Sequence, residues 1–253
     1  MSAIEGVLPV DKPSGWTSHD VVAIARGALG ISRIGHGGTL DPLATGVLPL
    51  LVGRATKFAD RLHTAAKAYA GKVTFGSETE TDDAEGSVTR SAEPPALDAA
   101  AIDRLLESFR GEIAQVPPSY AAVKVGGRHA YARARAGERF TLAPRNVRID
   151  RISVASWEPP VLRLLVVCST GTYIRSIARD LGRAAGSAAH LGGLRRLAVG
   201  GLGAAEALPL EELRRGTTAA LGALRAADDR ILVLEPRLLA DPADAILAEW
   251  GRP

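Results

Sequence analysis

Several short stretches of the chain alternate apolar and polar residues or run apolar, and these stretches predict strands. A short strand is expected over 6–10, and residues 67–76 alternate as a half-buried strand does. Two more strands are expected at about 146–157 and 161–168, on either side of the turn Trp-Glu-Pro-Pro. These stretches follow one another at the spacing of a meander rather than of a βαβ repeat.

Helical periodicity predicts three helices between these strands. Ser18 can cap a helix over about 19–28, with Gly30 at its end. A second helix is expected over 98–110, and a third in the stretch that follows the strand at 161–168. Consecutive strands with segregated helices predict an α+β fold with a mixed, largely antiparallel central sheet flanked by helices.

The stretch Gly-His-Gly-Gly-Thr-Leu-Asp-Pro-Leu-Ala-Thr-Gly at 35–46 places one carboxylate, Asp41, among four glycines. Read locally, Asp41 is a helix N-cap with Pro42 at the first helical position, followed by apolar residues. That interpretation predicts a helix or turn that ends near Asp60. Under this interpretation the Asp41 carboxylate has a structural role and no catalytic one.

Composition narrows the class of protein. The 253 residues are 46% hydrophobic, enough for one large domain or a domain with a small appendage. The lone Cys168 excludes a disulfide framework and a cysteine zinc site. The N-terminus lacks the pattern of a secretory signal, and the apolar run at 161–168 is too short to cross a bilayer. We therefore expect a cytoplasmic protein with no membrane partner.

Charge is unevenly distributed. The net charge is +3, yet residues 201–253 hold six arginines against nine acidic residues, so the cationic surplus lies in 1–200. It is densest in 121–148, where Glu138 is the single acid among seven cations; Tyr131 lies among these cations and Tyr120 just before them. The cations of this segment are Lys124, Arg128, Arg133, Arg135, Arg139, Arg145 and Arg148. This pattern favours a nucleic-acid-binding surface over a merely solvated face.

Several other kinds of functional site are excluded because the sequence lacks their motifs. No Gly-Lys-Ser/Thr follows the glycines, so a phosphate-binding loop is excluded, and the dinucleotide fingerprint lacks its spacing. The histidines are scattered, so no metal site is expected, and no second carboxylate can be nominated for a glycosidase. The acidic stretch Ser-Glu-Thr-Glu-Thr-Asp-Asp-Ala-Glu-Gly at 77–86 does not fit a calcium loop, and most of its acids are expected to be exposed.

Five ordered motifs carry a family resemblance. GHGGTLDPLATG, preceded by DKPSGWTSHD, resembles the active-site region of the TruB family of tRNA pseudouridine synthases. The resemblance continues through KAYAGKVTFGSETETDDAEG, QVPPSYAAVKVGGRHAYARARAG, STGTYIRSIARDLG and AHLGGLRRLAVG, from about residue 6 to 200. It implies isomerisation of uridine 55 in the T loop of tRNA to pseudouridine, with no cofactor.

The resemblance also implies roles for individual residues. Asp41 matches the catalytic carboxylate, and Arg175 matches the arginine that pairs with it in the catalytic set. Tyr69, the third catalytic match, corresponds to the tyrosine that stacks on the target base and is a candidate for the proton transfer at C5. Asp41 could act as a nucleophile or as a base, and the sequence leaves both open. Tyr173 and Leu194 match residues that line the pocket of the flipped nucleotide.

The resemblance implies roles for two further residues and for one segment. His36 matches a histidine inserted where the flipped base leaves the T loop, and Lys12 belongs to an entry motif with a mainly structural role. The segment at about 117–148 matches a thumb-like insertion that folds over the T loop, with Lys124, Arg128, Arg133, Arg135 and Arg139 as its RNA-binding cations.

Domain organisation follows from the same matches. Family members commonly append an RNA-binding PUA-type domain, but only about 50 residues follow the last motif here, too few for another β-barrel. The expected organisation is a catalytic domain over 1–245 and a tail at 246–253, with no complete PUA domain, and we expect a monomer. The alternative function is a tRNA-binding folding chaperone that uses the same cleft.

Overall fold

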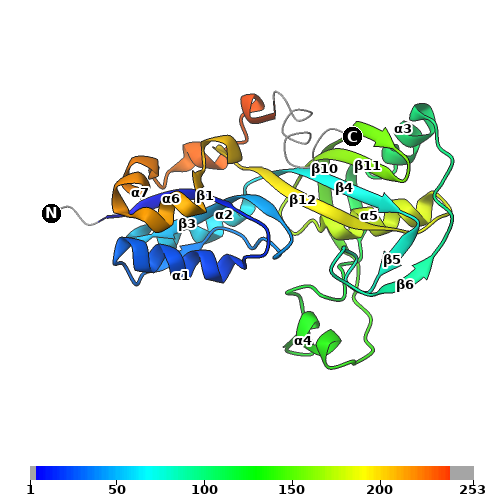
Figure 1. Cartoon of the computed structure of the whole chain (residues 1–253), viewed down its shortest axis with the longest axis horizontal. Helices are drawn as coiled ribbons and strands as arrows, with labels where there is room; N and C mark the ends of the chain where they lie inside the picture. The colour runs from blue at the N-terminus through cyan, green and yellow to red at the C-terminus, as the bar shows by residue number, and fades with distance from the viewer. Residues whose placement is uncertain (1–3, 240–253) are drawn as a thin grey trace. The chain divides into compact units, whose positions relative to one another are not determined.

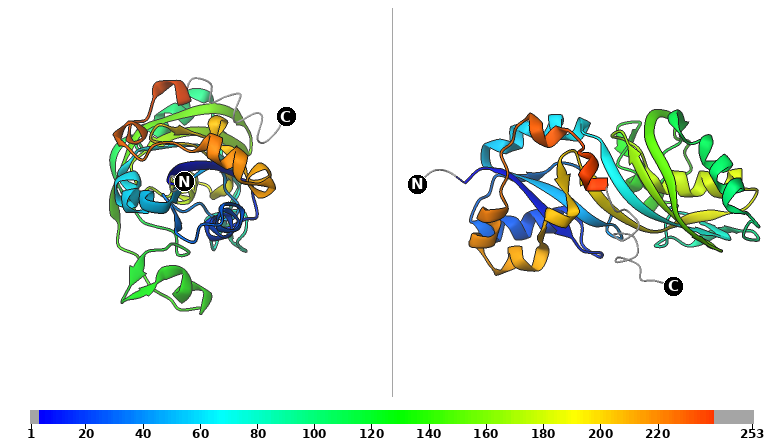
Figure 2. Two further views of the ribbon diagram at one scale, coloured as in Figure 1. Left: turned by 90° about the vertical axis from the view of Figure 1, so that its left-hand side faces the viewer. Right: turned by 90° about the horizontal axis from the view of Figure 1, so that it is seen from above.

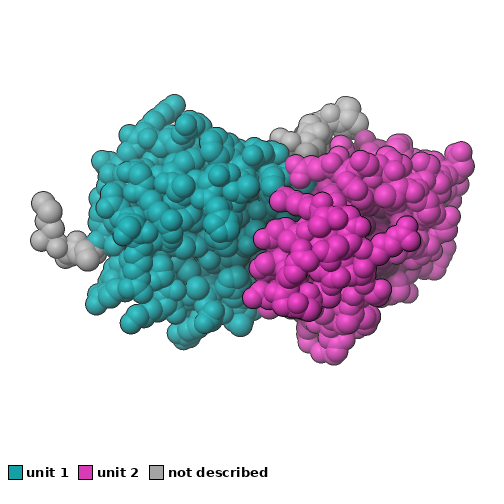
Figure 3. Space-filling model, turned by 90° about the horizontal axis from the view of Figure 1, so that it is seen from below, with its two compact units in different colours: residues 1–70, 194–253 teal, residues 71–193 magenta. Residues whose placement is uncertain are grey.

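The computed structural model describes residues 4–239, and the chain divides into two compact units (Figure 3). The first unit comprises residues 1–70 and 194–253, and the second comprises 71–193. Two strands, β4 (Lys67–Phe75) and β12 (Ala189–Val199), run from one unit into the other. The predicted tail at 246–253 and the boundary at 245 lie outside the described residues.

The first unit is built on strands that carry an almost continuous apolar face. They are β1 (Gly6–Lys12), β2 (Ile34–His36), β3 (Thr45–Val52), β13 (Leu202–Gly203) and β14 (Leu208–Pro209), joined by the end of β12. Their hydrogen-bonded order is β14-β1-β3-β12, with β2 paired to β3 and β13 to β12. β1 and β3 are antiparallel, whereas β12 runs parallel to β3 through the pairs Arg195–Thr45 and Arg196–Gly46.

Helices flank these strands in the first unit (Figures 1 and 2). The α-helices are α1 (Ser18–Leu29), α2 (Ala59–Thr64), α6 (Leu210–Arg215) and α7 (Thr217–Ala223). The short 3-10 helices are η1 (Gly53–Phe58), η2 (Ala204–Glu206), η3 (Asp229–Leu232) and η4 (Pro236–Leu239). Helices α2 and η3 cover a hydrophobic cluster that includes Val7, Val47, Leu51 and Leu62.

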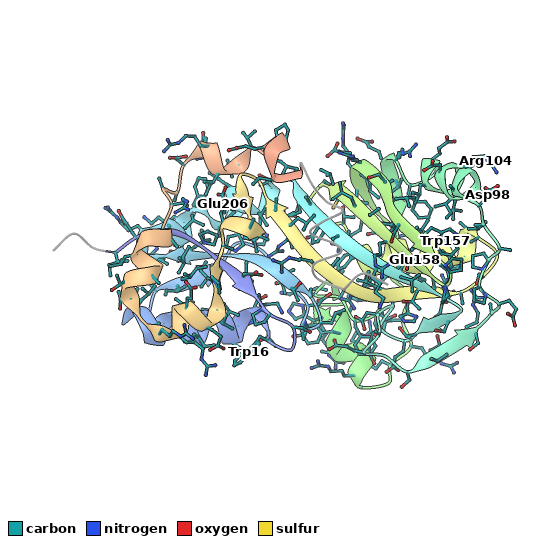
Figure 4. The ribbon with its side chains drawn as sticks, turned by 45° about the horizontal axis from the view of Figure 1, so that its top comes forward. Trp16, Asp98, Arg104, Trp157, Glu158 and Glu206 are labelled. Atoms are coloured by element: carbon teal, nitrogen blue, oxygen red, sulfur yellow. The ribbon has the colours of Figure 1, made fainter. Side chains whose placement is uncertain are left out.

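The helix α1 shows how local sequence sets an element. Thr17, not the predicted Ser18, is its N-cap, because Thr17 and Asp20 form a reciprocal capping box. Gly30 ends the helix in the left-handed conformation, with φ of 65°. Trp16 lies just before the cap, where the Arg214 guanidinium of α6 stacks over its ring at 5.7 Å (Figure 4).

The helix or turn predicted to run from Asp41 towards Asp60 is wrong over most of its length. Pro42 and Leu43 form a turn, and the chain then enters strand β3, of which all residues but Thr45 are buried. A fully buried strand is a continuous apolar run and lacks the alternation that distinguishes a half-buried strand from a helix. Helical structure begins only at η1 and α2.

The second unit has an antiparallel meander at its centre. β4 pairs with β11 (Val161–Cys168), β11 with β10 (Arg145–Glu158), and β10 with β7 (Gly111–Gln115). The short hairpin of β5 (Ser77–Thr79) and β6 (Val88–Ser91) follows β4. The strands predicted over 67–76, 146–157 and 161–168 are confirmed to within a residue or two.

Two helices complete the second unit. α3 (Ala99–Glu107) begins at the N-cap Asp98, whose carboxylate accepts a 2.7 Å hydrogen bond from Ala101 N, and Trp157 of β10 donates to Leu97 O at 2.9 Å just before this cap (Figure 4). α5 (Ile174–Ala184) ends just before Gly186, which has φ of 68°. Both helices were predicted, and the fold class, a mixed central sheet flanked by helices, is confirmed.

The segment predicted as a thumb-like insertion folds into a small piece of its own. It contains β8 (Lys124–Val125), β9 (Arg128–His129) and α4 (Ala130–Arg135), drawn in green in Figure 1. Its apolar cluster is formed by Ala121, Val123, Ala130 and Leu142. Within residues 4–239, no helix has the length and apolar character needed to cross a membrane.

Candidate active site

The loop that carries Asp41 joins β2 to β3 in the first unit, and side chains from outside the loop hold it in place. The buried Ser18 hydroxyl donates to Leu40 O at 3.2 Å and accepts from Leu40 N at 2.9 Å, directly before Asp41. Pro42 O, directly after Asp41, accepts from Lys12 Nζ at 3.2 Å and from Gly15 N at 2.9 Å. The half-buried Asp41 is therefore fixed through both of its neighbours.

Lys12 lies at the end of β1 and is fully buried. Besides Pro42 O, its ammonium group donates to Pro13 O at 2.9 Å and Trp16 O at 2.7 Å. A buried ammonium group is tolerated only where hydrogen bonds replace its water. Three main-chain acceptors, two of them before α1 and one after Asp41, tie the two loops together, which fits the structural role expected of Lys12.

Arg196 of β12 was not singled out from the sequence, and the structure places it under the Asp41 loop. Its side chain is 1% exposed. The guanidinium donates to three main-chain oxygens of the loop and of β3: Gly38 O at 3.0 Å, Thr39 O at 3.2 Å and Val47 O at 2.8 Å. Burial lowers the pKa of Arg196. Tyr69 opposes this shift through its charge and a side-chain hydrogen bond, and Asp41 opposes it through its charge.

Four of the predicted site residues lie in the first unit with Asp41, namely Lys12, His36, Tyr69 and Leu194. Tyr69 is half-buried on β4 and hydrogen bonds the same guanidinium. Leu194 is 8% exposed at the point where β12 enters the unit, and its carbonyl accepts from the Thr45 hydroxyl at 3.5 Å. The guanidinium of Arg196 is the group that Asp41 and Tyr69 share.

His36 ends β2, three residues before the loop turns towards Asp41. Its ring packs edge-on against His19, with centroids 5.5 Å apart, and its Nδ1 accepts from Gly38 N at 3.4 Å. Burial lowers the pKa of His36, and electrostatic interactions with His19, His63 and Arg196 lower this pKa further. His36 is therefore a neutral imidazole at physiological pH.

The remaining predicted residues belong to the second unit. Arg175 lies on α5 and is 6% exposed, and its guanidinium donates to Thr81 O at 3.0 Å and Tyr120 O at 3.1 Å. It also pairs with Asp83 at 3.5 Å, a buried carboxylate. Tyr173, the N-cap residue of α5, exchanges two hydrogen bonds with the Gln115 side chain at 2.8 and 3.1 Å.

The expectation that the acids of 77–86 are mostly exposed is wrong for three of the five. Glu78, Asp82 and Asp83 are 6%, 8% and 3% exposed, and each pairs with an arginine of α5. Glu78 also binds Arg90, and hydrogen bonds from Arg183 and then Arg90 lower the pKa of Glu78 to about 2. Burial raises the pKa of Asp82, against the charge of Arg179 2.8 Å away.

The five cations predicted to bind RNA in the 121–148 segment fall into two groups. Arg128 and Arg133 both bind the single acid Glu138 at 2.7 Å, and Arg133 also lies over the Phe140 ring. Lys124, Arg135 and Arg139 are exposed, and Arg135 lies 5.7 Å over the Tyr131 ring. The second group is the one available to a polyanion. No group of three histidine, cysteine or acidic side chains that could hold a metal occurs among the residues from 4 to 239.

Comparison with known proteins agrees with these motifs. A model of the TruB family pseudouridylate synthase N-terminal domain matches residues 26–174. The chain is 48% identical over 217 residues to tRNA pseudouridine synthase B of Gloeobacter violaceus, covering 84% of this chain and 74% of that protein. It is 49% identical over 215 residues to the same-named protein of Streptomyces griseus subsp. griseus, covering 81% and 72%.

Solved structures point in the same direction. A chain in the crystal structure of a Cbf5-Nop10-Gar1 complex superimposes with a TM-score of 0.69 at 28% identity, over 88% of this chain and 60% of that one. The family model covers more than half of the sequence, and the two named relatives are matched over more than two thirds of their length. The chain therefore belongs to the TruB family of pseudouridylate synthases, which are isomerases.

Proposed function

We propose that this protein converts uridine 55 in the T loop of tRNA into pseudouridine, with Asp41 as the catalytic carboxylate. The relatives named tRNA pseudouridine synthase B support tRNA as the substrate. The observation that carries the role of Asp41 is its position on a loop whose main chain is held by the buried Lys12, Ser18 and Arg196 side chains. Such fixation is what a preorganised catalytic group requires.

The reaction needs one acid–base or nucleophilic group and no donor. The C1′–N1 bond of the nucleoside breaks, the base turns, and a C1′–C5 bond forms. The proton on C5 is lost and N1 gains one, so the product is an isomer of the substrate. A carboxylate can hold the ribose or the base as a covalent intermediate, or take a proton from the ribose.

The other residues bind the substrate or assist Asp41. The target uridine must leave its stack to reach a side chain on the protein, so base flipping is part of the proposal. Tyr69 stacks on the flipped base, Leu194 and Tyr173 line its pocket, and His36 enters the space that the base leaves. Arg175 keeps the role of cationic partner that the resemblance implies. The exposed cations Lys124, Arg135 and Arg139 bind phosphates of the T arm.

The test is to incubate the protein with an unmodified tRNA transcript and map pseudouridine by carbodiimide labelling and primer extension. We expect product at uridine 55 with the wild-type protein. Asp41→Asn keeps the size of the side chain, so it should fold and bind tRNA but lose at least a thousandfold in rate. Asp60→Asn, an exposed carboxylate of α2, is the matched control and should retain the wild-type rate.

The possible results of this experiment distinguish the separate parts of the proposal. Product at another uridine would contradict the position, and an active Asp41→Asn variant would contradict the role of Asp41. A wild-type protein that binds and refolds tRNA without forming pseudouridine would instead favour the RNA chaperone function.

A further inference from the structure

The fully buried guanidinium of Arg196 connects two stretches of chain on either side of Asp41. Its Nη2 and Nη1 donate to Gly38 O and Thr39 O, which precede Asp41 by three and two residues. Its Nε donates to Val47 O, six residues after Asp41. One rigid, planar group therefore spans the base of the loop that carries the carboxylate, a geometry that lysine cannot reproduce.

The same guanidinium also acts on side chains. It interacts by charge with Asp41 and by a hydrogen bond with the Tyr69 side chain. Because arginine keeps its proton in proteins, Arg196 is a permanent positive charge that is itself shielded from water. Its contacts are with the protein itself, so it is placed to hold Asp41 and Tyr69 and not to touch RNA.

The preceding residue shows that this arrangement is specific to Arg196. Arg195 is the next residue back on the same strand, so its side chain points to the other face of β12. It pairs with Asp11 at 2.9 Å and donates to the Thr45 hydroxyl at 3.4 Å, whereas the carbonyls of Gly38, Thr39 and Val47 accept from Arg196. Arg195 and Arg196 are the same residue type on the same strand and differ in their partners, so Arg195 is a matched control for Arg196.

We infer that Arg196 is a positioning residue for pseudouridine formation: it fixes the backbone on both sides of Asp41 and orients the Tyr69 hydroxyl relative to that carboxylate. The inference rests on the proposed role of Asp41. It predicts that loss of the guanidinium geometry slows the reaction of bound RNA and leaves RNA affinity almost unchanged, because the phosphate-binding cations lie in the 121–148 segment.

The experiment compares Arg196→Lys with Arg195→Lys in the full chain. The single-turnover rate at saturating unmodified tRNA and the Kd for the same transcript are both measured, with circular dichroism as the check on folding. For Arg196→Lys we expect a rate at least a hundredfold lower and a Kd within threefold of wild type. Arg195→Lys should stay within threefold in both.

A double-mutant cycle with Tyr69→Phe tests whether Arg196 acts through the Tyr69 hydroxyl or only stabilises the surrounding structure. If Arg196 acts partly through the Tyr69 hydroxyl, Arg196→Lys should cost at least tenfold less in rate when that hydroxyl is already absent. Equal losses in both backgrounds would overturn the link to Tyr69. A normal rate for Arg196→Lys, or a Kd raised a hundredfold with a normal rate for bound RNA, would overturn the inference as a whole.

Two controls keep the result decisive. Arg196→Gln retains a donor without the charge and is measured in parallel. If neither variant folds, Arg196 is a structural residue and the positioning role is overturned. Asp41→Asn separates this inference from the proposed function. An active Asp41→Asn variant refutes the proposed function. An inactive Asp41→Asn variant together with an unimpaired Arg196→Lys variant refutes only the positioning role of Arg196.

Discussion

Gly46→Ala tests whether the close approach of β3 and β12 beneath the Asp41 loop is a fixed feature of the fold. Gly46 has φ of 102° and pairs with Arg196 across the two strands. A Cβ added there would lie 2.7 Å from the Arg196 nitrogen and closer still to its carbonyl oxygen. These are main-chain atoms of a buried strand, so no flexible side chain can move aside.

The magnitude follows from two separate costs. A side chain at positive φ costs about 1 kcal/mol, and forcing an extra carbon into a packed strand pair costs about 1–3 kcal/mol. The free energy of unfolding should therefore fall by about 3 kcal/mol. Gly30→Ala is the matched control, since Gly30 also has positive φ, of 65°, but nothing lies within 4 Å of its Cβ position. It should lose only about 1 kcal/mol.

Urea unfolding followed by circular dichroism measures both variants. A Gly46→Ala protein no less stable than Gly30→Ala would refute the reasoning, because the steric cost would then be absent. The displaced Arg196 main chain should also slow pseudouridine formation in Gly46→Ala more than in Gly30→Ala.

Two further predictions concern charges in the second unit. The pKa of Glu78 is about 2 in the fold and 4.5 ordinarily, so its pairing stabilises the protein above about pH 4.5 and is lost as pH falls towards 2. At pH 7 Glu78→Gln should therefore lower the free energy of unfolding by about 3 kcal/mol, and urea titrations towards pH 2 should show this difference vanish. The double change Arg135→Gln with Arg139→Gln should weaken tRNA binding and flatten its log–log salt dependence by about 0.7–0.9 per lost phosphate contact. Arg133→Gln should mainly lower the melting temperature, because Arg133 is held by Glu138; a salt slope changed equally by all three arginines would contradict this division.

The strand and helix pattern of the chain is predictable wherever one face is exposed. Strand β11, which is buried except at Val161, was predicted from the turn Trp-Glu-Pro-Pro before it, whereas strand β10 and helices α1 and α3 carry alternation or caps that the sequence displays. Strand β3 does not, because it is buried on both faces and its pattern cannot be distinguished from that of a buried helix. The N-cap interpretation of Asp41 failed for the same reason, since the turn at Pro42 leads into a strand.

The buried acids of the second unit show a different limit. Glu78, Asp82 and Asp83 look solvated in a polar, turn-rich stretch, and their partners lie about a hundred residues further along the chain. A signal did exist on α5. Arg175, Arg179 and Arg183 recur every four residues and form one stripe on a helix whose residues are mostly buried. Two members of this stripe, Arg175 and Arg179, are buried, and a buried cation requires a carboxylate or other polar partner, which the acidic stretch supplies.

The motifs of the candidate site identified Asp41 and Tyr69, but they did not show what holds these residues. In the stretch Leu-Arg-Arg-Leu at 194–197, either arginine could face the core, and only the register of β12 against β3 decides between them. The parallel pair of Arg196 with Gly46 turns Arg196 inward and Arg195 towards Asp11. A single-residue slip of this strand would exchange the two side chains and leave the Asp41 loop without its buried cation. The register of two paired residues therefore determines which arginine can serve the carboxylate, and Gly46 is the position that permits that pairing.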